Sequence, residues 1–134
     1  MEPYEFLAHT ADLSILARGR SLEELFRNAM KALYEAMGPR WIETEPASRG
    51  INVNSTSDED LLVDFYNELL GLADIEKEAY REIAFAHLGE SKLEADLRGF
   101  RIDGYSRNIK AATHHDLSLK EMKGGFEATI VLDV

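Results

Sequence analysis

The sequence predicts an α+β fold, a single domain of residues 1–134 with two helices packed on a largely antiparallel β-sheet. Two long segments place apolar residues three and four positions apart, which is the spacing of an amphipathic helix. Several shorter segments alternate apolar and polar residues, and most of them lie together in the C-terminal half. Strands that follow one another in this way favour an antiparallel sheet, and 134 residues suffice for one core.

The N-terminal region predicts two strands with a polar step between them. Apolar-rich segments run over residues 4–9 and 13–18, and Thr10-Ala11-Asp12 separates them. We therefore expect Asp12 to lie at the end of a strand.

The first helix is predicted to begin at Leu22 and to end at Gly38-Pro39. Ser21 can cap its first turn through the side-chain hydroxyl, and Glu24 can reach back to complete a capping box. The apolar stripe of this helix consists of Leu22, Leu25, Phe26, Ala29, Met30, Leu33, Tyr34 and Met37.

A second helix is predicted to start within residues 55–60, which supply capping side chains and negative charge. It should end near residues 74–77. Its apolar side consists of Leu61, Leu62, Phe65, Leu69 and Leu72.

The segment between the helices contains two prolines and a glycine, which predict a loop over residues 39–50 that covers Trp41. A short strand at residues 51–53 follows. After the second helix, alternating patterns predict strands over 83–87, 93–97, 100–102, 109–113, 117–122 and 126–132. Lys123-Gly124-Gly125 predicts a hairpin turn before the last strand.

Composition narrows the function classes. The chain has 25 acidic and 15 basic residues and a formal charge of -10, which disfavours direct, tight binding to nucleic acid. Cysteine is absent, which excludes disulfides and thiolate metal sites and suits a reducing compartment. No apolar run has the length of a membrane helix or of a secretory signal, so we expect a cytoplasmic protein without a membrane span.

The familiar catalytic motifs are missing. The chain has no phosphate-binding GxxxxGK[ST], no GxGxxG after a strand, no HExxH and no GxSxG, so standard motif enzymes are poor candidates. The polar residues that remain lie at predicted strand edges, where sheet proteins often place their sites. They are His9, Thr10, Asp12, Lys110, Thr113, His114, His115 and Asp133.

Each of these candidates has two interpretations. Asp12 alone is either a turn-forming carboxylate or part of a site. Asp133 is either a solvated end residue or, with the oxygens at Val134, part of an oxygen cluster suited to Ca²⁺ or Mg²⁺. Lys110 is either solvated or placed to hold phosphate oxygens beside a metal.

The two adjacent histidines are unsuited to binding one metal ion together. Neighbouring residues on a strand point to opposite faces, so His114 and His115 should not both be ligands of a single ion. This alternation predicts one buried and one exposed histidine.

Five segments together carry a family resemblance. They are HTAD at 9–12, SLEELFRNAMKALYEAM at 21–37, DLLVDFYNELL at 60–70, IKAATHH at 109–115 and VLDV at 131–134. In order and spacing the chain resembles the archease family from end to end. The resemblance implies a protein that activates the RNA-splicing ligase RtcB, promoting guanylylation and multiple turnover of that ligase in tRNA splicing and broadening its nucleotide use. It implies a protein cofactor and not an enzyme.

The resemblance also implies roles for individual residues. Asp12 and Asp133 match the essential acidic positions of the family, Lys110 matches its basic position, and Val134 matches its terminal metal-contacting position. The implied ligase-activating patch is therefore Asp12, Lys110 and Asp133, and the implied metal ligands are Asp12, Asp133 and Val134, with Ca²⁺ or another divalent cation. His114 stands where the family leads us to expect an aromatic residue such as Tyr, whereas His115 fits.

Two other classes of function are weighed against this one. The chain could be a general chaperone or modulator of nucleic-acid-processing proteins, which would require a broad apolar binding surface. An independent metal hydrolase is the third class, and for it the sequence offers neither an evident general base nor a complete ligand set.

Overall fold

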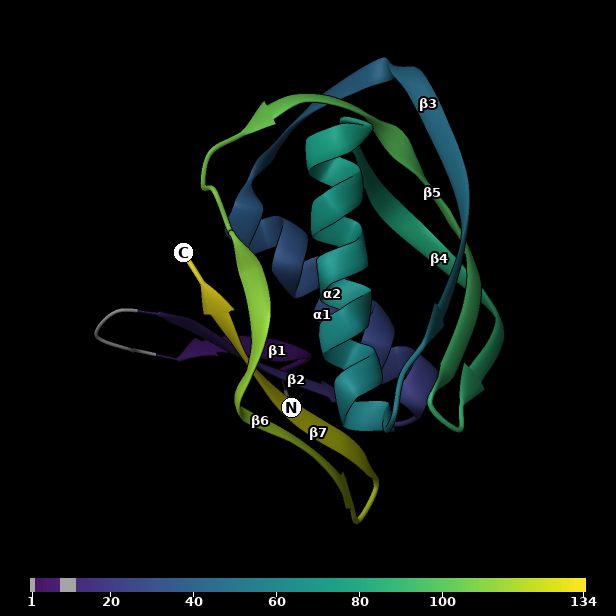
Figure 1. The fold of residues 1–134 in the computed structure, drawn as a ribbon, viewed down its shortest axis with the longest axis vertical. Coiled ribbons are helices and arrows are strands. Elements are labelled where there is room, and N and C mark those ends of the chain that lie inside the picture. The colour runs from purple at the N-terminus through teal and green to yellow at the C-terminus, as the bar shows by residue number, and fades with distance from the viewer. Residues whose placement is uncertain (1, 8–11) are drawn as a thin grey trace.

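The computed structural model describes residues 2–7 and 12–134. Within them two helices lie between two antiparallel sheets (Figure 1). The α+β class and the antiparallel pairing are confirmed. The strands form two sheets where the sequence predicted one, because the second helix is apolar around most of its circumference and needs cover on both sides.

The four-stranded sheet has the order β1-β2-β7-β6. Its strands are β1 (Tyr4–Leu7), β2 (Leu13–Gly19), β6 (Ala111–Met122) and β7 (Gly125–Asp133). The segments predicted as separate strands at 109–113 and 117–122 form one strand, β6, whose pairing with β7 shifts between Thr113 and Ser118. The predicted hairpin is confirmed, since Met122 pairs with Gly125 across the turn.

The three-stranded sheet has the order β3-β5-β4. Its strands are β3 (Pro39–Asn54), β4 (Glu78–Gly89) and β5 (Lys92–Tyr105). The loop predicted over residues 39–50 is therefore wrong, because these residues belong to β3. An outer strand tolerates the missing N–H of a proline, and the pairing with β5 shifts between Ile42 and Pro46 to accommodate it.

Both predicted helices are confirmed, as α1 (Leu22–Met37) and α2 (Asp58–Ile75). The Ser21 hydroxyl accepts a hydrogen bond from the Glu24 amide, while the Glu24 carboxylate accepts from the amide of Arg20 instead of that of Ser21. Gly38 ends α1 in the left-handed conformation with φ +61°, which glycine adopts without steric cost. Within the described residues, neither helix has the length and apolarity needed to cross a membrane.

One hydrophobic core fills the space between the sheets and receives side chains from both helices. Its largest fully buried side chains include Tyr66, Phe26 and Phe65. The Tyr66 hydroxyl donates a 2.5 Å hydrogen bond to the Ala29 carbonyl and so links the two helices. This core holds the sheets in place, and with them the strand ends that carry the candidate site.

Candidate functional site

One end of the four-stranded sheet brings together residues from both halves of the sequence. Leu13 pairs with Leu132 in the β2–β7 register, so Asp12 and Asp133 flank this pair at the same end of the sheet. Ala111 pairs with Asp133 on the other side of β7, and the Lys110 amide donates to the Asp133 carbonyl at 2.8 Å. The fold therefore places Asp12, Asp133 and Lys110 at the ends of three neighbouring strands.

These three charged residues are accessible to solvent. Asp12 is half-buried, whereas Lys110 and Asp133 are exposed, and Val134 beyond them is 40% exposed. In residues 2–7 and 12–134, none of the three charged side chains forms an ion pair. We call Asp12, Lys110 and Asp133 the strand-end patch.

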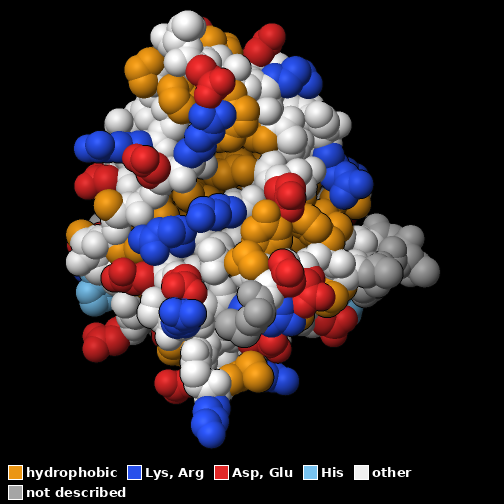
Figure 2. Space-filling model, turned by 180° about the vertical axis from the view of Figure 1, so that it is seen from behind, with side chains coloured by type: hydrophobic (Ala, Val, Ile, Leu, Met, Phe, Trp, Pro, Cys, Tyr) orange, Lys and Arg blue, Asp and Glu red, His pale blue; other side chains and the backbone are white. Residues whose placement is uncertain are grey.

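A shallow groove borders the patch on the β1 side. It is lined by Phe6, Leu13, Glu35, Ala36, Ser106 and Arg107. Phe6 is 41% exposed, and its neighbour Leu7 is 38% exposed. On the face that Figure 2 shows, apolar side chains gather near the middle with charged side chains of both signs around them.

The other polar candidates lie in different places. His9 and Thr10 are outside the described residues. The Thr113 hydroxyl donates to the Val131 carbonyl at 3.2 Å and so serves the β6–β7 pairing. The prediction of one buried and one exposed histidine is wrong, because the His114 and His115 side chains are 60% and 71% exposed. Both lie where the shift in β6 register interrupts strict alternation.

His114 contacts an acidic side chain that the sequence analysis did not anticipate as its neighbour. Its Nε2 lies 3.2 Å from Oδ1 of Asp60, in the first turn of α2. Hydrogen bonds from Thr56 and Ser57, together with the nearby His114, lower the pKa of Asp60 and favour its charged form. The contact links β6 to the first turn of α2.

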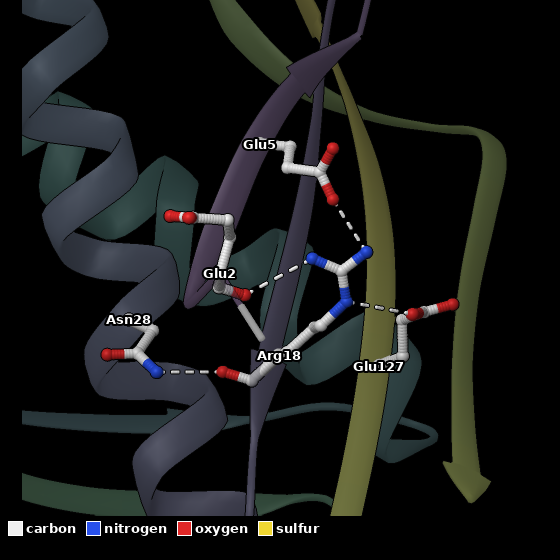
Figure 3. Close-up of polar contacts among 5 residues, drawn as sticks. All are labelled: Glu2, Glu5, Arg18, Asn28 and Glu127. Carbon is white, nitrogen blue, oxygen red and sulfur yellow. Dashed lines mark hydrogen bonds and ion pairs between the residues drawn. The ribbon is translucent and has the colours of Figure 1, made fainter.

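Arg18 holds the edge strand β1, which precedes Asp12 in the sequence, through several polar contacts (Figure 3). Its guanidinium lies 2.6 Å from the Glu5 carboxylate and 3.1 Å from that of Glu127, and it donates to the Glu2 carbonyl at 3.1 Å. The Arg18 carbonyl accepts from the Asn28 side chain at 2.7 Å. One side chain on β2 thus ties β1 to β7, and an arginine at the end of the apolar-rich segment 13–18 was the only sequence signal for it.

The strand-end patch and Val134 offer oxygen atoms, the type of ligand that a hard cation prefers. They offer fewer of these ligands than such a cation needs. Asp12, Asp133 and the oxygens at Val134 are oxygen donors of the kind that Ca²⁺ prefers, and Ca²⁺ takes roughly six to eight of them. No cluster of three His, Cys, Asp or Glu side chains suited to a metal occurs in the described part of the chain. Water or a partner would have to supply the remaining ligands.

Comparisons with known proteins agree with this arrangement of strands and helices. Residues 4–134 match the Archease protein family (MTH1598/TM1083). A protein archease from Methanosarcina mazei is 31% identical over 98% of this chain and 95% of the relative, and one from Methanosarcina barkeri is 32% identical over the same shares.

Two solved structures share the fold. The solution structure of Methanobacterium thermoautotrophicum Protein 1598 is 27% identical and covers 100% of both chains with a TM-score of 0.69. The crystal structure of a Thermotoga maritima archease, described as a possible chaperone, is 26% identical and has a TM-score of 0.69 over 96% of this chain and 94% of its own. Sequence and fold agree along nearly the whole length, and the chain belongs to the archease family.

Proposed function

We propose that this protein activates an RtcB-type RNA-splicing ligase through the strand-end patch of Asp12, Lys110 and Asp133. In this role it promotes guanylylation and multiple turnover of the ligase in tRNA splicing, and broadens the nucleotides that the ligase accepts. The single observation that supports the proposal best is the convergence of three charged residues at neighbouring strand ends. A cytoplasmic location goes with this role.

The chemistry assigned to the patch is positioning and electrostatic assistance. The Lys110 ammonium would hold phosphate oxygens of GTP, and the carboxylates of Asp12 and Asp133 would orient a metal ion beside them. The ligase's own histidine carries out the attack on the nucleotide. This protein is accordingly a cofactor of the ligase and has no turnover of its own.

Calcium is the metal we propose for Asp12, Asp133 and Val134. When bound, it would neutralise the two carboxylates and bring positive charge next to the transferring phosphate. Another divalent cation with oxygen preference would serve the same end. The positive charge of Lys110 beside the metal site would attract the phosphate oxygens of the nucleotide. The partner or its nucleotide would then supply some of the oxygen ligands of the metal.

The test is a time course of ligase guanylylation with limiting amounts of this protein, with and without added Ca²⁺. We expect substoichiometric stimulation, strengthened by Ca²⁺. Asp12→Ala and Lys110→Ala should abolish stimulation while leaving the circular dichroism spectrum unchanged, because both residues lie outside the core.

Matched controls lie at the opposite end of the same sheet. Lys123→Ala and Glu121→Ala remove one charge of each sign from exposed positions around the β6–β7 turn and should stimulate the ligase as the wild type does. Undiminished stimulation by Asp12→Ala and Lys110→Ala would sink the proposal.

General chaperone activity is the alternative, and the description of the Thermotoga maritima relative as a possible chaperone favours keeping it. The exposed Phe6 and Leu7 give the chain some apolar surface beside the patch. Suppression of aggregation of unrelated client proteins separates the two functions, since a dedicated ligase activator should show little of it.

A further inference from the structure

The side chain of Asn67 binds the open edge of strand β6. Its Nδ2 donates to the Ala112 carbonyl at 3.2 Å, and its Oδ1 accepts from the Ala112 amide at 2.8 Å. β6 is an outer strand of its sheet, so this side of Ala112 has no neighbouring strand. The Asn67 carboxamide thus supplies the paired donor and acceptor that a strand would otherwise provide.

A second contact joins the same two elements. Asp60 and Asn67 are seven residues apart, about two helical turns, and therefore lie on the same side of α2. Asp60 meets His114 while Asn67 meets Ala112, so α2 and the beginning of β6 run in opposite directions past one another. The Asn67 contact is the one nearer to Lys110.

Lys110 lies between two fixed points of the chain. On one side Ile109 is buried, with 3% of its surface exposed, and on the other side Ala112 is held by Asn67. The Lys110 amide also bonds to the Asp133 carbonyl at 2.8 Å. Two of these restraints come from the core and from β7, and the third comes from a single polar side chain on α2.

We propose that Asn67 is a positioning residue for the strand-end patch, whose carboxamide fixes the segment that carries Lys110 beside Asp133. The inference rests on the proposed function, because its effect on Lys110 is measured as a change in the guanylylation of the ligase. Without the two hydrogen bonds, the amide and carbonyl of Ala112 bond to water instead. The segment that carries Lys110 then becomes more mobile. A small displacement of a charged group suffices to weaken transition-state assistance strongly.

Two substitutions of Asn67 remove either both hydrogen bonds to Ala112 or one of them. A substitution of the neighbouring helix residue, Glu68, is the control. Asn67→Ala removes both hydrogen bonds and opens no cavity, since the side chain is exposed. Asn67→Asp is nearly the same size and keeps the acceptor for the Ala112 amide, but loses the donor for its carbonyl. Glu68→Ala changes an exposed side chain one position further along α2.

The experiment measures amide hydrogen exchange by NMR and ligase guanylylation on the same proteins. We expect exchange at Ala112 to be roughly tenfold faster in Asn67→Ala, the factor that corresponds to losing one net hydrogen bond. The maximal guanylylation rate at saturating protein should fall at least as much, with little change in the concentration that gives half of it. Asn67→Asp should be intermediate in both measurements, and Glu68→Ala should match the wild type.

The outcomes separate this inference from the proposed function. If Lys110→Ala abolishes stimulation but Asn67→Ala retains the full maximal rate despite fast exchange at Ala112, the inference is overturned and the proposed function stands. If the wild-type protein does not stimulate the ligase at all, the proposed function fails, and the inference fails with it. Unchanged exchange at Ala112 in Asn67→Ala would refute the positioning contact itself.

Discussion

Arg49 and Glu78 connect the two outer strands of the three-stranded sheet across the central strand. Arg49 lies on β3 and Glu78 on β4, and β5 runs between them. Nε of Arg49 lies 2.9 Å from Oε1 of Glu78, and Nη2 lies 3.1 Å from Oε2, which is a two-pronged ion pair. The Tyr80 hydroxyl donates to the same carboxylate at 2.5 Å.

Removing Arg49 should destabilise the fold more than a typical surface substitution. Glu78 is only 8% exposed, so Arg49→Ala leaves a nearly buried carboxylate without its cation. We expect the free energy of unfolding to fall by about 2 kcal/mol, below the range for fully buried pairs because Arg49 is itself partly exposed. Urea denaturation measures the loss, and Arg98→Ala, an exposed arginine on β5, is the control with little effect.

The same ion pair predicts a stability that depends on pH. The hydrogen bonds from Arg49 lower the pKa of Glu78 in the folded state, and Tyr80 adds to the effect. A carboxyl with a lower pKa when folded stabilises the protein above its unfolded pKa, and the contribution disappears as pH falls through the folded pKa. The difference in unfolding free energy between wild type and Glu78→Gln should therefore shrink as pH falls below the ordinary pKa of Glu. A difference that stays constant as pH falls well below that value would contradict the prediction.

Arg18 should control how firmly β1 is held. Arg18→Ala removes the contacts with Glu5, Glu127 and the Glu2 carbonyl, while the backbone pairing of β1 with β2 remains. We expect faster amide exchange along β1 and a loss of about 1–2 kcal/mol in unfolding free energy, as for charge-assisted hydrogen bonds that are partly exposed. Arg20→Ala, at an exposed position two residues later, should leave exchange in β1 unchanged. Unaltered exchange in Arg18→Ala would show that the sheet pairing alone holds the strand.

The two helices could be predicted from the sequence because the residues that start and end a helix act over a short distance along the chain. Ser21 and Gly38 mark the two ends of α1, and both act through bonds within one or two turns. The first part of strand β3, residues 39–50, was missed because its proline and glycine content resembles that of a loop, whereas the strand predicted at residues 51–53 is the end of β3. A strand tolerates Pro46 when it lies at a sheet edge, and edge position depends on the rest of the fold.

The candidate site could be predicted only in part, for a related reason. Asp12 and Asp133 are far apart in sequence, and only the β2–β7 register brings their strand ends together. The family resemblance supplied the pair, and residue patterns by themselves left both as ordinary turn and end residues. The exposure of both His114 and His115 follows from a register shift in β6, which alternation of side chains cannot reveal. The surroundings of these two histidines could be seen only in the three-dimensional structure.

Arg81 should control the environment of the only tryptophan in the chain. Its guanidinium carbon lies 4.3 Å from the ring centroid of Trp41 and 5.1 Å from that of Phe100, so the cation lies against two aromatic rings. Arg81→Ala exposes the Trp41 ring and should shift its fluorescence emission to longer wavelength. The unfolding free energy should fall by about 0.5–1 kcal/mol, the range for an exposed cation–π contact.

Glu43→Ala is the matched control for Arg81→Ala. It removes the ion pair that Arg81 forms with Glu43 at 2.6 Å but leaves the guanidinium free to stay on the rings. If the emission shifts equally in both variants, the ion pair and not the aromatic contact holds Arg81 in place. If it shifts only in Arg81→Ala, the stacked guanidinium itself shields Trp41, because an exposed ion pair contributes little energy of its own.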